Sequence, residues 1–198
     1  ADSLTTNVAG STATLANIET ITGDDGTDVI TLAGAVTGAS IDLGDGSDQV
    51  TLGGATTATL SNIETIAGST ASDVITLGSQ ITGAIINLGA GNDSLTLGAF
   101  ANTLTITNVE TIVANAGDDS VTLGSAITAG TINLGGGNDS LTLGSFVNSV
   151  TVSNVESVIG GVSSDTVTLL AQATGITVDL DAGSDKLVLG NFLNTITV

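Results

Sequence analysis

The chain contains no cysteine, histidine, methionine, tryptophan, tyrosine, proline or arginine, and Lys186 is its only basic residue. The lack of cysteine and histidine excludes disulfide bridges, soft metal sites and histidine-activated nucleophiles. The net charge of −19 repels nucleic acids and anionic lipid surfaces. The only aromatic residues are 3 phenylalanines, too few to form a stacking surface for bases or sugars. No apolar run approaches the roughly 18 residues that a membrane-spanning helix needs, which argues against membrane insertion.

The residues that are present follow the pattern of β-strands. Apolar residues make up 41% of the chain, enough to form a core. Val50 and Leu52 alternate with Gln49 and Thr51, so that one pair faces inward and the other outward. No stretch shows the period of an amphipathic helix. The sequence therefore predicts an all-β protein.

An aspartate recurs along the whole chain, followed two residues later by an apolar residue. The spacings between copies alternate between 20 and 25 or 26 residues, so two copies make a unit of 45 or 46 residues. The aspartates of this series are Asp2, Asp28, Asp48, Asp73, Asp93, Asp119, Asp139, Asp165 and Asp185. We expect one domain over 1–198, with a partial repeat at 1–16 and full repeats at 17–61, 62–107, 108–153 and 154–198.

Such a repeat buries its apolar face only against neighbouring copies, which predicts a stacked array. We expect a right-handed parallel β-solenoid of about nine coils, each 20 to 26 residues long. All the aspartates would then form one column about 4.8 Å apart, the spacing of neighbouring strands. The alternative is a single coil of 46 residues, which would give two columns of aspartates.

Four copies of the repeated turn share a glycine-rich motif, LGDGSD at 43–48, LGAGND at 88–93, LGGGND at 134–139 and LDAGSD at 180–185. This motif resembles the nonapeptide repeat of the repeats-in-toxin (hemolysin-type calcium-binding) family, Gly-Gly-x-Gly-x-Asp-x-apolar-x. The resemblance implies a calcium-binding β-roll from a large secreted or surface-anchored bacterial protein, such as a surface-layer protein, an adhesin or a filament. It also implies that calcium is held by the aspartates together with Gly44, Gly46, Gly89, Gly91, Gly135 and Gly137.

The chain also departs from this family's pattern. Leu replaces the first glycine of each motif, and Asp181 and Ala182 interrupt the fourth copy. The turns that precede the motif copies are irregular, and the opposite turns, such as 77–83, carry no acid. We therefore expect calcium along one edge only, with alternate sites weak or empty.

Electrostatics favours a cation independently of this resemblance. Two carboxylates about 4.8 Å apart repel by roughly 1 kcal/mol in water and by about 3–4 kcal/mol at an effective dielectric constant of 20. A Ca²⁺ ion between coils removes this repulsion, and nine coils leave gaps for at most about eight ions. The alternative is that the aspartates merely end turns, as Asp often does beside Gly.

Two further repeated sets accompany the aspartates. Glu19, Glu64, Glu110 and Glu156 are expected at solvated outer positions. An outward column on one face is predicted for Thr31, Thr51, Thr76, Thr96, Thr122, Thr142 and Thr168. Such a face could bind an ordered surface such as ice, although Thr is also simply a good outward strand residue.

The sequence predicts a mechanical role. The acids are repeated rather than gathered at one break in the repeat, and no Arg is present to orient an acidic sugar, so an enzyme is not expected. We expect a calcium-stabilised structural scaffold outside a bacterial cell, with other copies of the chain as its partners, end to end or side by side. The alternatives are an adhesin or ice-binding module that uses the Thr face, with an unknown surface ligand, and a calcium-free fibre that stacks on itself.

Overall fold

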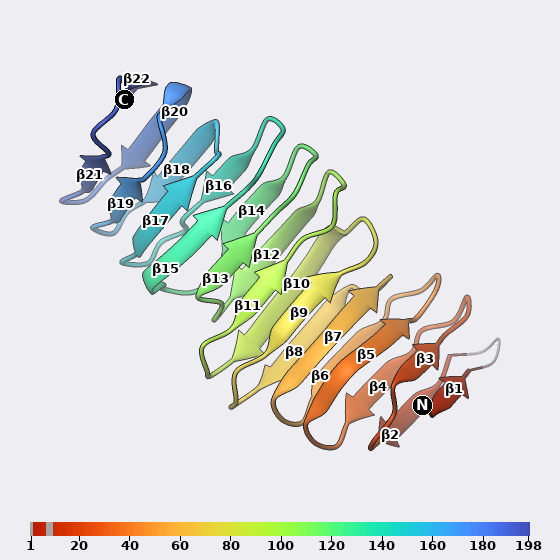
Figure 1. Cartoon of the computed structure of the whole chain (residues 1–198). Helices are drawn as coiled ribbons and strands as arrows, with labels where there is room; N and C mark the ends of the chain where they lie inside the picture. The colour runs from red at the N-terminus through yellow and green to blue at the C-terminus, as the bar shows by residue number, and fades with distance from the viewer. Residues whose placement is uncertain (1, 7–9) are drawn as a thin grey trace.

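The computed structural model describes residues 2–6 and 10–198, so residues 1 and 7–9 of the predicted partial repeat lie outside it. Two long parallel sheets face each other along an elongated body, and the chain passes from one sheet to the other at every strand (Figure 1). The prediction of an all-β parallel solenoid is confirmed. The described residues contain no helix that could cross a membrane.

Each sheet has eleven strands, and each strand pairs in parallel with the strand two positions away in the sequence. The odd-strand sheet consists of β1 (Ser3–Thr5), β3 (Thr20–Thr22), β5 (Val36–Asp42), β7 (Thr56–Ser61), β9 (Val74–Leu77), β11 (Ser94–Thr96), β13 (Thr111–Val113), β15 (Thr128–Asn133), β17 (Ser149–Ser153), β19 (Thr166–Leu169) and β21 (Lys186–Leu189). The even-strand sheet consists of β2 (Thr12–Leu15), β4 (Val29–Leu32), β6 (Gln49–Leu52), β8 (Thr65–Ser69), β10 (Thr82–Gly89), β12 (Thr103–Thr107), β14 (Ser120–Leu123), β16 (Ser140–Thr142), β18 (Ser157–Gly161), β20 (Thr174–Asp181) and β22 (Thr195–Thr197).

One coil contains one strand from each sheet, and the coils are shorter on average than the sequence predicted. Val29 pairs with Gln49, which confirms the shorter predicted coil at this step. Gln49 then pairs with Thr65 and not with Val74, so the longer predicted coil is wrong, and so is the alternative of one coil for a whole repeat. Hydrogen bonds between successive coils join residues 16 to 22 positions apart. The chain therefore makes about ten turns instead of nine.

The sequence repeat spans two and a half coils, and this moves each successive repeat to the opposite side of the solenoid. Asp28 precedes β4, and the equivalent Asp73 precedes β9, which is five strands later. Because a coil has two strands, an odd number of strands ends in the other sheet. The expectation of one column of aspartates is therefore wrong, and the aspartates alternate in pairs between the two edges.

We call the edge where the chain passes from an odd to an even strand the first edge, and the opposite one the second edge. The aspartates of the first edge are Asp28, Asp48, Asp119 and Asp139. The aspartates of the second edge are Asp2, Asp73, Asp93, Asp165 and Asp185. The expectation that acids would line only one edge is also wrong.

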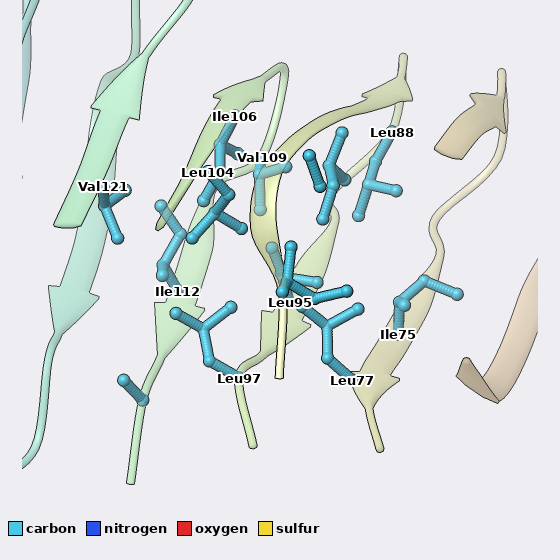
Figure 2. Close-up of a cluster of buried hydrophobic side chains, with 14 of the residues drawn as sticks. Ile75, Leu77, Leu88, Leu95, Leu97, Leu104, Ile106, Val109, Ile112 and Val121 are labelled. Carbon is cyan, nitrogen blue, oxygen red and sulfur yellow. The ribbon is translucent and has the colours of Figure 1, made fainter. Parts of the chain in front are cut away.

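The core is a single stack of aliphatic side chains between the two sheets. Ile75, Leu95 and Ile112 are neighbours in register on β9, β11 and β13, and all three are fully buried (Figure 2). Burying a side chain of this size contributes about 1.5–3 kcal/mol, so the stack supplies most of the driving force for folding. The core also holds the turns at each edge directly above one another.

The outward threonines are divided between the two faces for the same reason as the aspartates. Thr31, Thr51, Thr122 and Thr142 lie on the even-strand sheet. Thr76, Thr96 and Thr168 lie on the odd-strand sheet. The predicted single threonine face is therefore wrong, because its members point to opposite sides of the molecule.

Candidate functional site

The predicted aspartates mostly do not point into solvent. Seven of them are at most 1% exposed, namely Asp28, Asp48, Asp73, Asp93, Asp119, Asp139 and Asp165. Asp2 is exposed and Asp185 is partly exposed, and both belong to coils at the ends of the described stack. Each of the nine stands immediately before a strand, at the point where a turn re-enters the sheet.

One oxygen of each buried carboxylate pairs with the backbone of the preceding coil. The Asp28 N–H donates to Asp48 Oδ1 at 2.7 Å, and the Asp119 N–H donates to Asp139 Oδ1 at 2.8 Å. The same bond recurs at the second edge, where the Asp73 N–H donates to Asp93 Oδ1 at 2.7 Å. A buried N–H without an acceptor is costly, so these carboxylates are part of the fold as well as candidate ligands.

The repeated glutamates continue these columns by one more coil. The N–H groups of Asp48, Asp93 and Asp139 donate at 2.7, 2.8 and 2.8 Å. Their acceptors are Oε2 of Glu64, Glu110 and Glu156, respectively. The prediction that these glutamates are merely solvated is therefore wrong. In the sequence these glutamates stand 16 or 17 positions after the second aspartate of each pair. This spacing differs from the 20 and 25 or 26 residues that separate the aspartates.

Two buried asparagines, in the coils that precede Asp119 and Asp165, belong to the same columns and were not predicted from the sequence. Asn102 Oδ1 accepts the Ile81 N–H at 3.0 Å, and Asn102 Nδ2 donates to the Phe100 carbonyl at 2.7 Å and to Asp119 Oδ1 at 2.9 Å. Asn148 has the same bonds at the second edge. The recurring Phe-x-Asn pattern was the available signal, but nothing in it distinguishes a column position from an ordinary loop.

The second oxygen of most buried aspartates is left without a hydrogen bond. Within residues 2–6 and 10–198, no partner is found for Oδ2 of Asp48, Asp93, Asp119, Asp139 and Asp165. Burial raises the pKa of Asp48, Asp93 and Asp119, and it raises the pKa of Asp139 to about 6. Neighbouring acids, such as Asp119 and Glu156 beside Asp139, add to the increase in pKa. A buried carboxylate oxygen of this kind calls for a proton or a cation.

The glycines of the motif leave a small oxygen-lined space beside these carboxylates. A Cβ atom on Gly46 would lie 2.6 Å from Asp48 Oδ1 and 2.8 Å from the Gly26 carbonyl oxygen. A Cβ atom on Gly91 would lie 2.9 Å from both Asp93 Oδ1 and the Ala71 carbonyl oxygen. Any larger residue would fill the space between the turns of two successive coils, so these positions require glycine.

Gly44, Gly89 and Gly135 serve a different purpose in the same turns. Their φ angles are 83°, 92° and 86°, in the region that favours glycine. A Cβ atom at Gly44 or Gly135 would also collide with the backbone carbonyl of Asp24 or Asn115 in the coil below. In the fourth copy Asp181 replaces this glycine and adopts a φ of 59°, a conformation that Asp tolerates better than most residues.

These contacts define four pairs of stacked turns in which a hard cation would fit. The first pair is 22–28 with 43–48, the second is 67–73 with 88–93, the third is 114–119 with 134–139 and the fourth is 160–165 with 180–185. In the described chain no three acidic side chains are close enough to hold a metal alone, so carbonyls such as that of Gly26 and water would complete the shell. The pairs alternate between the edges, and this arrangement replaces the predicted single row of up to eight gaps.

Comparison of the sequence with protein-family models and with curated proteins, and of the fold with solved structures, finds no match.

Proposed function

We propose that the chain is a calcium-stabilised structural scaffold, a segment of an extracellular bacterial surface layer, filament or adhesin stalk. The observation that supports this proposal is the set of buried aspartate oxygens for which the described residues supply no partner. Ca²⁺ takes six to eight oxygen ligands from carboxylates, carbonyls and water, which matches the groups that face one another across each turn pair. When bound, the ion would offset the charge of the stacked acids and join successive coils.

A purely structural role for the aspartates leaves Oδ2 of five buried members of the series unexplained. Oδ1 accepts a backbone N–H, as in the bond from Asp28 to Asp48. That task needs one neutral acceptor, and Asn102 performs it in the same kind of position. The chain nevertheless places carboxylates in the two following coils, where burial disfavours their charge. An amide such as that of Asn102 would serve the fold equally well, so a bound cation explains why these positions carry a carboxylate.

The shape of the molecule supports a mechanical role. The body is a stack held together by parallel strand pairing along its whole length (Figure 1). Its acids repeat along both edges. A stack of this kind transmits force along its axis and pairs with like surfaces, so we propose other copies of the chain as its partners. Calcium near about 1 mM outside the cell would order the stack after export. We propose no catalytic activity.

The test measures circular dichroism and sedimentation of the full chain after chelator treatment and again after addition of Ca²⁺ or Mg²⁺. At ten times Kd each site contributes about 1.4 kcal/mol, so four sites raise the unfolding midpoint by at least about 10 °C. Mg²⁺ should produce a much smaller increase, because it dehydrates reluctantly and demands octahedral geometry. An unfolding midpoint that is insensitive to both chelator and calcium would refute the calcium assignment. If large assemblies persisted as well, the calcium-free fibre would be the better description.

A further inference from the structure

The four turn pairs are not chemically equal, and the contrast is clearest between the first-edge pairs and the second pair. The first and third pairs lie at the first edge, and the second and fourth pairs lie at the second edge. Each pair is built from an irregular turn below and a glycine-rich turn above. The glycine-rich turns share one motif apart from additional acids at Asp45 and Asp181, and the irregular turns differ more.

At the first edge each turn pair has two unpartnered carboxylate oxygens. In the first pair they are Asp24 Oδ2 and Asp48 Oδ2, both buried with no hydrogen bond from any described residue. In the third pair they are Asp119 Oδ2 and Asp139 Oδ2, equally without a partner in the described chain. Asp48, Asp119 and Asp139 are each 1% exposed, so bulk water does not take the place of a partner.

In the second pair serine replaces the additional acid of the first pair. Ser69 stands four residues before Asp73, as Asp24 stands four residues before Asp28. Its N–H and Oγ donate to Asp73 Oδ2 at 3.1 and 3.4 Å, which satisfies that oxygen without a metal. Only Asp93 Oδ2 then lacks a partner among the described residues of the second pair.

The residue immediately before the lower aspartate is an acid in the third pair and serine in both second-edge pairs. At the first edge Asp118 Oδ1 accepts the Asn138 N–H at 2.8 Å. At the second edge Ser72 Oγ accepts the Asn92 N–H at 3.0 Å, and Ser164 Oγ accepts the Ser184 N–H at 2.9 Å. The same type of hydrogen bond thus joins the turns at both edges, but the first and third pairs carry more acidic residues in their turns than the second pair. The fourth pair carries Asp181, and its Asp165 Oδ2 has no partner among the described residues, so in this respect it resembles the third pair.

We propose that the first-edge pairs bind calcium more tightly than the second pair, so that the first edge fills at low calcium and the second pair only at higher calcium. This inference rests on the proposed calcium-stabilised scaffold. The affinity of a calcium site increases with the number of charged ligands, and Ser69 supplies a neutral donor where Asp24 supplies a carboxylate. Calcium thus links the coils of the solenoid in two stages. At intermediate calcium the coils of 67–93 remain the less stable part of the stack.

The test follows backbone amide NMR signals of the full chain during a calcium titration that starts from the chelator-treated protein. Gly46 and Gly137 report the first edge, and Gly91 reports the second edge. We expect the calcium midpoint at Gly91 to be at least about tenfold higher than the midpoint at Gly46. Exchanging the residue types at positions 24 and 69 should then change the affinities of the two pairs in opposite directions. Ser69→Asp should lower the Gly91 midpoint, and Asp24→Ser should raise the Gly46 midpoint, each by about tenfold.

Asp45→Ala is the control, because Asp45 is exposed in the upper turn of the first pair and contributes charge without a buried oxygen. It should change the Gly46 midpoint by less than about twofold, because exposed charges are strongly screened. A common midpoint for all reporters, or exchange variants that behave like Asp45→Ala, would overturn the edge difference and leave the calcium scaffold intact. Amide signals that do not respond at any site up to about 10 mM calcium would overturn the calcium scaffold itself.

Discussion

Two successive turns at the first edge, 97–102 and 114–119, solve the same structural problem with different residues. Asn102 Oδ1 accepts the N–H of Ile81, and Asp119 Oδ1 accepts the N–H of Asn102 at 2.9 Å. The remaining amide group of Asn102 donates to the Phe100 carbonyl, whereas Asp119 Oδ2 has no partner in the described chain. The fold needs an acceptor oxygen in each turn and does not need a charge. The charge of Asp119 is therefore the part of this turn that points to a function.

The largest effect should come from removing the acceptor itself. Asn102→Ala leaves the Ile81 N–H without its acceptor and removes the side-chain donor to Asp119 Oδ1, which we expect to cost about 3 kcal/mol of folding free energy. The thermal midpoint should fall by about 6–12 °C, equally with calcium and with chelator. A loss seen only in the presence of calcium would contradict the structural role of Asn102.

The next effect tests the charge of the turn 114–119. Asp119→Asn keeps an acceptor oxygen and makes this turn resemble the turn of Asn102. In chelator we expect no loss of stability, because the variant removes a buried carboxylate whose pKa is raised by burial. With calcium at ten times Kd, the variant should lack about 1.4 kcal/mol of the stabilisation. Calorimetric calcium binding and thermal unfolding measure the two halves of this prediction, and an unchanged calcium response would contradict it.

The pH dependence separates a proton from a calcium ion as the partner of the unpaired oxygens. Burial raises the pKa of Asp139 to about 6, above the value of about 3.9 in an unfolded chain. The folded state therefore holds the proton more tightly, and this stabilisation is complete below about pH 4 and lost as the pH rises through about 6. In chelator the midpoint should rise by at least about 3 °C between pH 7 and pH 5.

Asp139→Asn provides the control for this pH dependence, because an amide does not titrate. The variant should show a flatter pH profile in chelator than the parent chain. Saturating calcium should also flatten the profile of the parent chain, because protons and calcium compete for the same oxygens. A midpoint that falls with acidification in chelator would show that the buried aspartates are already well paired.

The smallest effect concerns the end of each acidic column. Glu110→Gln keeps the oxygen that accepts the Asp93 N–H, so the folding free energy should change by less than about 0.5 kcal/mol. Glu110→Ala removes that oxygen and should cost about 1–3 kcal/mol. Chemical denaturation of the two variants measures the difference. Equal losses would mean that the charge of Glu110, and not its hydrogen bond, stabilises the turn.

Much of the fold follows from local features of the sequence. The alternation of Val50 and Leu52 with Gln49 and Thr51 predicted β-strands, and all four residues lie in β6. The number of coils in a repeat did not follow, because the length of a sequence repeat does not fix whether it contains an even or an odd number of strands. The segment from the second aspartate of a pair to the next glutamate is itself a full coil. This coil is not visible in the aspartate spacing, because its column position holds Glu instead of Asp.

The sequence by itself determined the strand pattern, the repeat and the identity of the acids, because these depend on residue types at short separations. Only the tertiary structure decided which acids lie above one another and which edge each one occupies. The physical reason is that stacking optimises core packing and backbone hydrogen bonds between coils, and these contacts join residues far apart in the sequence. A repeat of two and a half such coils alternates its sides, and it thereby produces two edges of different charge from one repeated motif.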